Sequence, residues 1–313
     1  MFISQVYRFK YDFWRYIIGT LVVIAGIILG QFPFLIALFL EKGADTLSMS
    51  ESEMMTALDS NYFLFYMLLP FAVGLAVLLF LVPRLHAQSI RALTTARKKI
   101  DWSRFWFAFG LLAVFIILTT VGDYLANPED YLYNFKLVPF LILCVVAVIF
   151  VPLQTSFEEY FFRAYLMQGF GTLAGNRWVP LFVTSLIFGG LHFLNPEVTK
   201  LGNIIMIHYI GTGFFLGIMT LMDEGIELAL GFHAANNLLT ALLVTADWTA
   251  FQTHSIFKDV SEPSLGWDVL IPVLIIYPLF LFIMARKYGW SNWKHKIFGK
   301  VEKPLAVETT DFY

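Results

Sequence analysis

Three short clusters of polar residues lie within the apolar second half of the chain. The first is the run EEYFFR at residues 158–163. At about 100° per residue in a helix, Glu159 and Arg163 lie one turn apart and can form an ion pair, whereas Glu158 points about 100° away. The spacing predicts one carboxylate held by an arginine beside a second carboxylate that is available as an acid or base. A helix end among lipid headgroups, where charges are tolerated, would account for the same residues.

The second and third clusters each place a histidine one helical turn from a second residue. Phe188 and His192 are four residues apart, so the phenyl ring can form a wall beside the imidazole. His233 and Asn237 share a helix face in the same way. Histidine and asparagine also form hydrogen bonds between packed membrane helices, which would explain both clusters without any chemistry.

The composition identifies the elements that must position these clusters. Of the 313 residues, 58% are hydrophobic and 14% are charged, whereas soluble domains carry about 25% charged residues. The chain is too apolar for a soluble or disordered protein, and its net charge of -2 gives no field for nucleic acid. The single cysteine, Cys144, excludes a disulfide framework and a cysteine metal cluster. We predict an all-α polytopic membrane protein.

Mostly apolar runs of roughly 20 residues, the length that crosses a bilayer, mark the predicted spans. There are eight, at residues 16–40, 61–83, 105–122, 137–157, 178–194, 201–222, 228–246 and 268–285. The first run is too long for a signal-peptide core, and we expect a retained helix that kinks near Pro33. The fourth belongs to a helix reaching from Lys136 to Gly169, which must either break near Pro152 or project from the membrane.

Lysine and arginine are concentrated in alternate loops. With the N-terminus in the cytoplasm, the inner segments hold 16 of these residues and the outer loops only Lys42, Lys136, Lys200 and Lys258. Cytoplasmic loops carry such an excess, so we predict an integral protein of the plasma (inner) membrane with both termini cytoplasmic. The basic loop 84–104 either only sets this topology or also contacts anionic lipid headgroups.

The rise of a helix places two of the clusters at one depth. At about 1.5 Å per residue, Glu158 lies roughly 20 Å from Gly171, and His192 lies roughly 22 Å from Arg177 on the returning helix. The two side chains can therefore meet. His233 is shallower, at about 12 Å from the turn at 223–225, so its helix must start deeper or tilt. We expect the acidic residues of that turn to be solvated.

The clusters match three family motifs in order, E-E-x-x-x-R at 158–163, F-x-x-x-H at 188–192 and H-x-x-x-N at 233–237. The chain thus resembles the CAAX protease and bacteriocin-processing family (CPBP, also called abortive infection or Abi) of intramembrane peptidases. The resemblance covers residues 137–246 and implies an eight-helix peptidase whose site opens toward the cytoplasm. The catalytic residues it implies are Glu158, Glu159, His192, His233 and Asn237, and Arg163 and Phe188 are the expected structural supports.

Peptide hydrolysis needs an activated water molecule and donors for the oxyanion. We expect Glu158 to act as the general base with help from His192. His233 and Asn237 would donate to the tetrahedral intermediate from one helix face. Glu158, His192 and His233 are alternatively a ligand set for a divalent metal such as zinc, with one position left for water. Mechanisms with and without a metal explain the same residues.

Two other functions fit parts of the sequence. A noncatalytic scaffold or immunity protein could use the same fold, and a proton-coupled transporter could use Glu158, His192 and His233 as a relay. The intact motifs favour a peptidase over a scaffold, and the first half of the chain lacks the counterpart residues expected of a transporter. The sequence contains neither H-E-x-x-H nor G-x-S-x-G, the common zinc and serine protease motifs.

We expect three parts in the chain. Residues 1–136 carry the first three spans, residues 137–246 form the catalytic core with spans four to seven, and residues 247–313 carry the last span and a basic cytoplasmic tail. The expected partners are a peptide or membrane-protein substrate and the lipid bilayer, with no nucleic acid.

Overall fold

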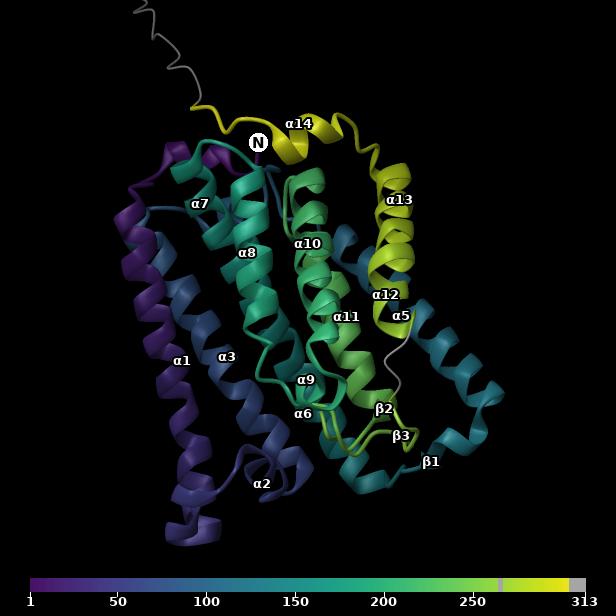
Figure 1. Ribbon diagram of the computed structural model, residues 1–313. Coiled ribbons are helices and arrows are strands. Elements are labelled where there is room, and N and C mark those ends of the chain that lie inside the picture. The colour runs from purple at the N-terminus through teal and green to yellow at the C-terminus, as the bar shows by residue number, and fades with distance from the viewer. Residues whose placement is uncertain (264–266, 304–313) are drawn as a thin grey trace, which may run out of the picture.

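The computed structural model describes residues 1–263 and 267–303, which form a bundle of long helices lying side by side (Figure 1). The α-helices are α1 (Phe13–Lys42), α2 (Glu51–Thr56), α3 (Ser60–Leu85), α4 (Ile90–Thr94), α5 (Trp102–Ala126), α6 (Leu137–Glu158), α7 (Met167–Ala174), α8 (Trp178–Gly190), α9 (Pro196–Leu201), α10 (Met206–Asp223), α11 (Glu227–Leu243), α12 (Trp267–Ile271), α13 (Tyr277–Tyr288) and α14 (Trp293–Phe298). The π-helical segments are η4 (Glu159–Leu166) and η6 (Pro272–Ile276), and the 3-10 helices are η1 (Ser4–Arg8), η2 (Gly43–Ser48), η3 (Pro128–Asp130) and η5 (Asn203–Ile205). A small sheet pairs β3 (Phe257–Asp259) with antiparallel β1 (Tyr131–Tyr133) and parallel β2 (Val244–Thr245).

Six helical segments of the described chain are long and apolar enough to cross a membrane. They are Phe13–Ser48, Ser60–Leu85, Trp102–Ala126, Leu137–Ala174, Asn203–Asp223 and Val269–Tyr288. The predicted count of eight is not confirmed, because the helices within the fifth and seventh predicted spans are short. Helix α8 has 13 residues and α11 has 17, or roughly 20–26 Å in a hydrocarbon core about 30 Å thick. The chain is an all-α polytopic membrane protein, and the predicted tail extends into residues 304–313, outside the described residues.

Helices α6, η4 and α7 form one continuous segment of 38 residues, Leu137–Ala174. Pro152 lies inside α6 without ending it, so the predicted alternative of a break there is wrong. At about 1.5 Å per residue the segment is roughly 57 Å long, far more than the hydrocarbon core, and it must tilt or project. Helix α1 likewise passes through Pro33 without interruption.

Glycines allow the helices that frame the motif residues to pack closely. A Cβ on Gly231 of α11 would lie 2.1 Å from the carbonyl oxygen of Phe105 in α5. A Cβ on Gly213 of α10 would lie 2.8 Å from the carbonyl oxygen of Ser185 in α8. Nonbonded atoms do not approach this closely, so a larger residue would push each pair apart. The two contacts therefore fix the spacing of the α5–α11 and α8–α10 pairs.

A cluster of charges closes the bundle where α10 turns into α11. Asp223 and Glu227 flank this turn, and their side chains are 2% and 1% exposed. Arg97 Nη2 lies 3.1 Å from Asp223 Oδ2 and 2.6 Å from Glu227 Oε2, and Arg104 also pairs with Asp223. The expectation of a solvated turn is wrong for these two residues, because Arg97 from the loop before α5 and Arg104 from the first turn of α5 pair with the two carboxylates.

Glu224, in the same turn, connects segments from the two ends of the described chain. It accepts hydrogen bonds from the backbone N–H of Phe2 and from Lys296 Nζ in α14, and Arg177 Nη1 lies 3.5 Å away. Burial tends to raise the pKa of this carboxyl, but the Lys296, Phe2 and Arg177 contacts outweigh burial and hold the pKa below its ordinary value of 4.5. The start of the chain, the start of α8 and α14 thus meet at one acidic side chain.

Replacing Arg97 by alanine is expected to lower the free energy of unfolding by about 3 kcal/mol, because it removes a charged partner from two buried carboxylates. The measurement is a denaturation curve of the purified protein in detergent. The control is Lys98→Ala, which removes a neighbouring exposed cation and should change stability by less than about 0.5 kcal/mol. Equal losses in the two variants would contradict a specific role for the Arg97 contacts.

Stability should also fall on acidification through Glu224. Its folded-state pKa is lowered, so its contribution is complete above the ordinary carboxyl pKa and is lost as the pH falls through the folded value. Glu224→Gln should therefore be less stable than the wild type at pH 7, and the gap between their unfolding temperatures should narrow as the pH falls below 4.5. A gap that is constant between pH 7 and pH 3.5 would contradict this role.

Candidate active site

The structure gathers two of the motifs at one point inside the bundle. Glu158 ends α6, Glu159 begins η4, and His233 lies in α11. His233 Nδ1 donates to Glu159 Oε1 at 2.8 Å, and His233 Nε2 lies 3.5 Å from Glu158 Oε2. The imidazole thus lies between two carboxylates that are adjacent in sequence.

A π-helical segment, η4, begins at Glu159, directly after Glu158. Both glutamates have α-helical backbone angles, with φ/ψ of -63°/-44° at Glu158 and -68°/-43° at Glu159. Their two carboxylates nevertheless both reach the imidazole of His233 on α11. Short π-helical segments of this kind are found frequently at functional sites.

Arg163 forms the predicted ion pair with Glu159, with 3.0 Å between Nη1 and Oε1. The two side chains are 1% and 0% exposed, and the guanidinium lies over the ring of Phe188, 3.9 Å from its centroid. One oxygen of Glu159 thus accepts from both Arg163 and His233. Glu159 is the carboxylate that is held in place.

Glu158 differs from Glu159 in its surroundings. Within the described part of the chain, the Oε2 atoms of both glutamates are buried without a hydrogen-bond partner. Only Glu158 lines the cavities of the site, whereas Glu159 faces packed protein. Glu158 is therefore the carboxylate that an incoming water molecule or substrate can reach.

His192 follows the end of α8 and lines the same cavity as Glu158. Its Nδ1 lies 2.8 Å from the carbonyl oxygen of Phe188, which fixes this nitrogen as a donor and leaves Nε2 for other partners. The imidazole is stacked on the ring of Tyr209, with 4.5 Å between centroids, and the Phe188 ring lies 4.9 Å away. Among the described residues, no hydrogen bond or ion pair joins His192 to Glu158.

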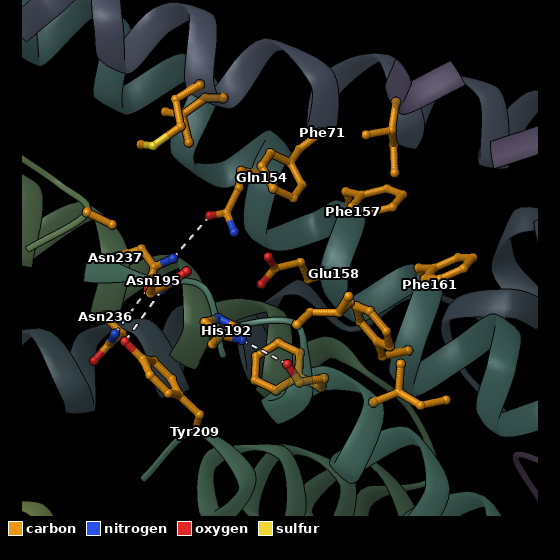
Figure 2. Close-up of a pocket in the computed structure, with 18 of the residues that line it drawn as sticks. Phe71, Gln154, Phe157, Glu158, Phe161, His192, Asn195, Tyr209, Asn236 and Asn237 are labelled. Carbon is orange, nitrogen blue, oxygen red and sulfur yellow. Dashed lines mark hydrogen bonds between the residues drawn. The ribbon is translucent and has the colours of Figure 1, made fainter. Parts of the chain in front are cut away.

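Asn237 has a partner that the sequence analysis missed. Its amide donates to Gln154 Oε1 at 3.1 Å, and its own Oδ1 accepts from the amide of Asn236 (Figure 2). Gln154 lies one turn before Glu158 on α6, so a polar residue four positions before the motif, inside an apolar run, was the available signal. Tyr209 was also missed as a contact of His192, and only the tertiary structure reveals it.

A large cavity of about 990 Å³ adjoins these residues. Figure 2 shows Glu158 pointing from the helix of Phe157 and Phe161 toward the side on which His192 and Asn237 lie, while Phe71, Phe157 and Phe161 form an apolar wall. The remaining lining comes mainly from α1, α3, α8 and the loop that follows α11. The space can hold several residues of an extended peptide or an apolar chain.

The three candidate metal ligands do not converge in the described structure. Nδ1 of His233 is bound to Glu159 and Nδ1 of His192 is bound to a backbone carbonyl, which leaves Nε2 of each ring as the nitrogen that could bind a metal. In the part of the chain that the structure describes, no three histidine, cysteine, aspartate or glutamate side chains are grouped as metal ligands. The predicted set of Glu158, His192 and His233 is therefore not assembled as a zinc site.

Comparisons with known proteins agree with the motifs. Residues 136–239 match the family described as type II CAAX prenyl endopeptidase Rce1-like. The chain is 33% identical over 274 residues to the uncharacterized protein YyaK of Bacillus subtilis (strain 168). The aligned region covers 84% of this chain and 88% of YyaK. No solved structure matches the chain. The described motif geometry and these matches together show that the chain belongs to the CAAX protease and bacteriocin-processing family.

Proposed function

We propose that this protein is an intramembrane endopeptidase that uses Glu158 to activate water. The observation that carries the proposal is the buried Oε2 of Glu158, which has no hydrogen-bond partner in the described structure and faces a cavity beside His233 Nε2. A buried polar atom without a partner is unfavourable unless a ligand or water satisfies it. A water molecule at this position would be held next to the base that deprotonates it.

The reaction uses the residues as follows. Glu158 takes a proton from water, and the water oxygen attacks the carbonyl carbon of the scissile peptide bond. The C–N bond then breaks, and the proton on Glu158 passes to the leaving amine. Nε2 of His192 assists by accepting a hydrogen bond from the same water molecule.

His233 and Asn237 are proposed to bind the oxyanion of the tetrahedral intermediate. Both lie on the face of α11 that borders the cavities, and donors aimed at a developing negative charge are effective in such a water-poor site. Glu159 accepts a hydrogen bond from Nδ1 of His233, so Nε2 donates to the oxyanion when the imidazole carries a proton on both nitrogens. The Asn237 amide, now bound to Gln154, turns toward the substrate carbonyl when a peptide is bound.

Arg163 and Glu159 position the reactive groups. The Arg163 guanidinium neutralises Glu159 and packs on Phe188, which contacts the rings of both catalytic histidines, at 4.9 Å for His192 and 6.1 Å for His233. Removing Arg163 would leave the charged carboxylate of Glu159 without its cation in the membrane interior, which is strongly unfavourable.

The proposed substrate is a peptide or membrane-protein segment with an apolar or lipid-modified part. The cavity is lined by Leu21 of α1 and by Leu191, which are 61% and 66% exposed on the bundle surface. Such a cavity can receive an apolar chain directly from the bilayer. We further propose that both termini of this inner-membrane protein are cytoplasmic, because basic residues are concentrated at the end of the bundle near α14 (Figure 1). We propose that the site opens toward the same side, because Phe13 and Tyr16 at the start of α1 line the cavity.

The test is cleavage of a peptide library, with lipidated and unmodified members, by detergent-purified protein. Glu158→Gln should lower the cleavage rate about 10²- to 10⁴-fold, the usual contribution of a general base, without loss of folding. The matched control is Glu262→Gln, which removes an exposed carboxylate paired with Lys200 and should leave the rate unchanged.

Cleavage that is equal in the wild type and Glu158→Gln would remove this residue from catalysis. Absence of cleavage by the wild type, with peptides that nevertheless bind, would favour a noncatalytic scaffold on the same fold.

A further inference from the structure

A second, smaller cavity lies next to the catalytic cluster. It has a volume of about 100 Å³ and shares Glu158, His192 and Tyr209 with the large cavity. It also has its own walls, which the large cavity does not touch, and these come from α10, α11 and the start of α13. The residues found only here are His208, Thr212, Leu216, Phe232, His233 and Tyr277. We call this space the inner chamber.

The walls of the inner chamber are polar and ordered. Thr212 Oγ1 donates to the carbonyl oxygen of His208 at 2.8 Å, so its 2.7 Å contact with Tyr277 must use the proton of the tyrosine hydroxyl. The oxygen of Tyr277 keeps a lone pair that can accept from another molecule. The hydroxyl pair thus joins α10 to α13 and presents an acceptor to the chamber.

Two polar groups at the chamber lack a hydrogen-bond partner within the described residues. One is Oε2 of Glu158. The other is the ring of His208, which contacts Tyr209 and Tyr277 only through its faces and edges and makes no hydrogen bond. Polar groups inside a membrane protein are normally satisfied by protein or by ordered water. A volume of about 100 Å³ accommodates about three water molecules at roughly 30 Å³ each.

The backbone around the chamber is also unusual. Tyr277 directly follows the π-helical segment η6, and Glu158 directly precedes the π-helical segment η4. Such segments are rare and are found frequently at functional sites. Both π-helical segments, η4 and η6, adjoin a residue that lines the inner chamber.

We propose that the inner chamber is a water-binding site that supplies the water consumed at Glu158. This inference rests on the proposed function. A substrate that fills the large apolar cavity excludes water from that side, so the attacking molecule must come from the opposite side of the carboxylate. His208, Thr212 and Tyr277 hold and orient the water without touching the peptide, and are therefore positioning residues. Glu158 accepts a proton from this water molecule, and the water oxygen forms the new C–O bond with the peptide carbonyl carbon.

The first measurement is radiolytic hydroxyl-radical labelling of the wild-type protein in detergent, followed by mass spectrometry. Radicals formed from bound water label nearby side chains, so His208 should be labelled. Tyr277 should be labelled also. Because His208 and Tyr277 are both partly exposed, the loss of their labelling in the Thr212→Leu variant described below is what separates chamber water from outside solvent. Tyr165 is a matched internal control, because it is a tyrosine that is 1% exposed and borders neither cavity. Labelling of His208 no faster than that of Tyr165 would overturn the proposal.

The second measurement uses Thr212→Leu, which fills the chamber with carbon, and Thr212→Ser, which keeps the hydroxyl. Thr212→Leu should lose labelling at His208 and show at least a tenfold lower kcat with an unchanged KM. Thr212→Ser should retain both. A normal kcat in Thr212→Leu without labelling would overturn the proposal, since the reaction would then draw its water elsewhere.

The labelling and the cleavage measurements test the water site and the proposed peptidase function separately. Labelling tests the water site in the wild type whether or not a substrate is known. Absence of proteolysis in the wild type would contradict the proposed function, while rapid labelling of His208 would still support a hydrated chamber.

Discussion

The site depends on one buried carboxylate. Glu159 accepts from Arg163 on its own helix and from His233 on α11, and these two contacts connect the long α6–α7 segment to α11. The guanidinium in turn packs on Phe188 of α8, so three helices meet at this ion pair. Charges inside a membrane protein are tolerated when they are paired in this way or face a water-filled cavity. Because Glu159 binds the guanidinium of Arg163 and the imidazole of His233, Glu158 remains free to face the cavities.

Two sets of contacts fix the position of α11, which carries His233. The close contact at Gly231 sets the distance of α11 from α5, and the charged cluster around Asp223 and Glu227 fixes the turn from which α11 starts. Helix α11 itself is too short and too polar to be a stable span by propensity alone. Its position is therefore determined by packing and by its buried polar contacts. The carboxylates of Glu158 and Glu159 then both reach His233 on this helix.

Part of this architecture could be predicted from the sequence. The Glu159–Arg163 pair and the Phe188–His192 contact follow from i,i+4 spacing, and the membrane bundle follows from composition. The count of eight spans could not be predicted reliably, because an apolar run does not reveal that α8 ends after 13 residues. The Asn237–Gln154 bond, the stacking of Tyr209 on His192 and the burial of Asp223 depend on partners distant in sequence. No local pattern encodes such contacts, and no propensity distinguishes a π-helical turn from an α-helical one.

The most direct test of the division between the two glutamates is the stability of Glu159→Gln and Glu158→Gln, measured as the free energy of unfolding in detergent. Glu159→Gln leaves Arg163 buried without its counter-charge and should be destabilised by about 3–5 kcal/mol. Glu158→Gln removes an unpartnered buried charge and should be at least as stable as the wild type. Equal losses, or a larger loss in Glu158→Gln, would contradict the claim that one glutamate holds the site together while the other is free to react.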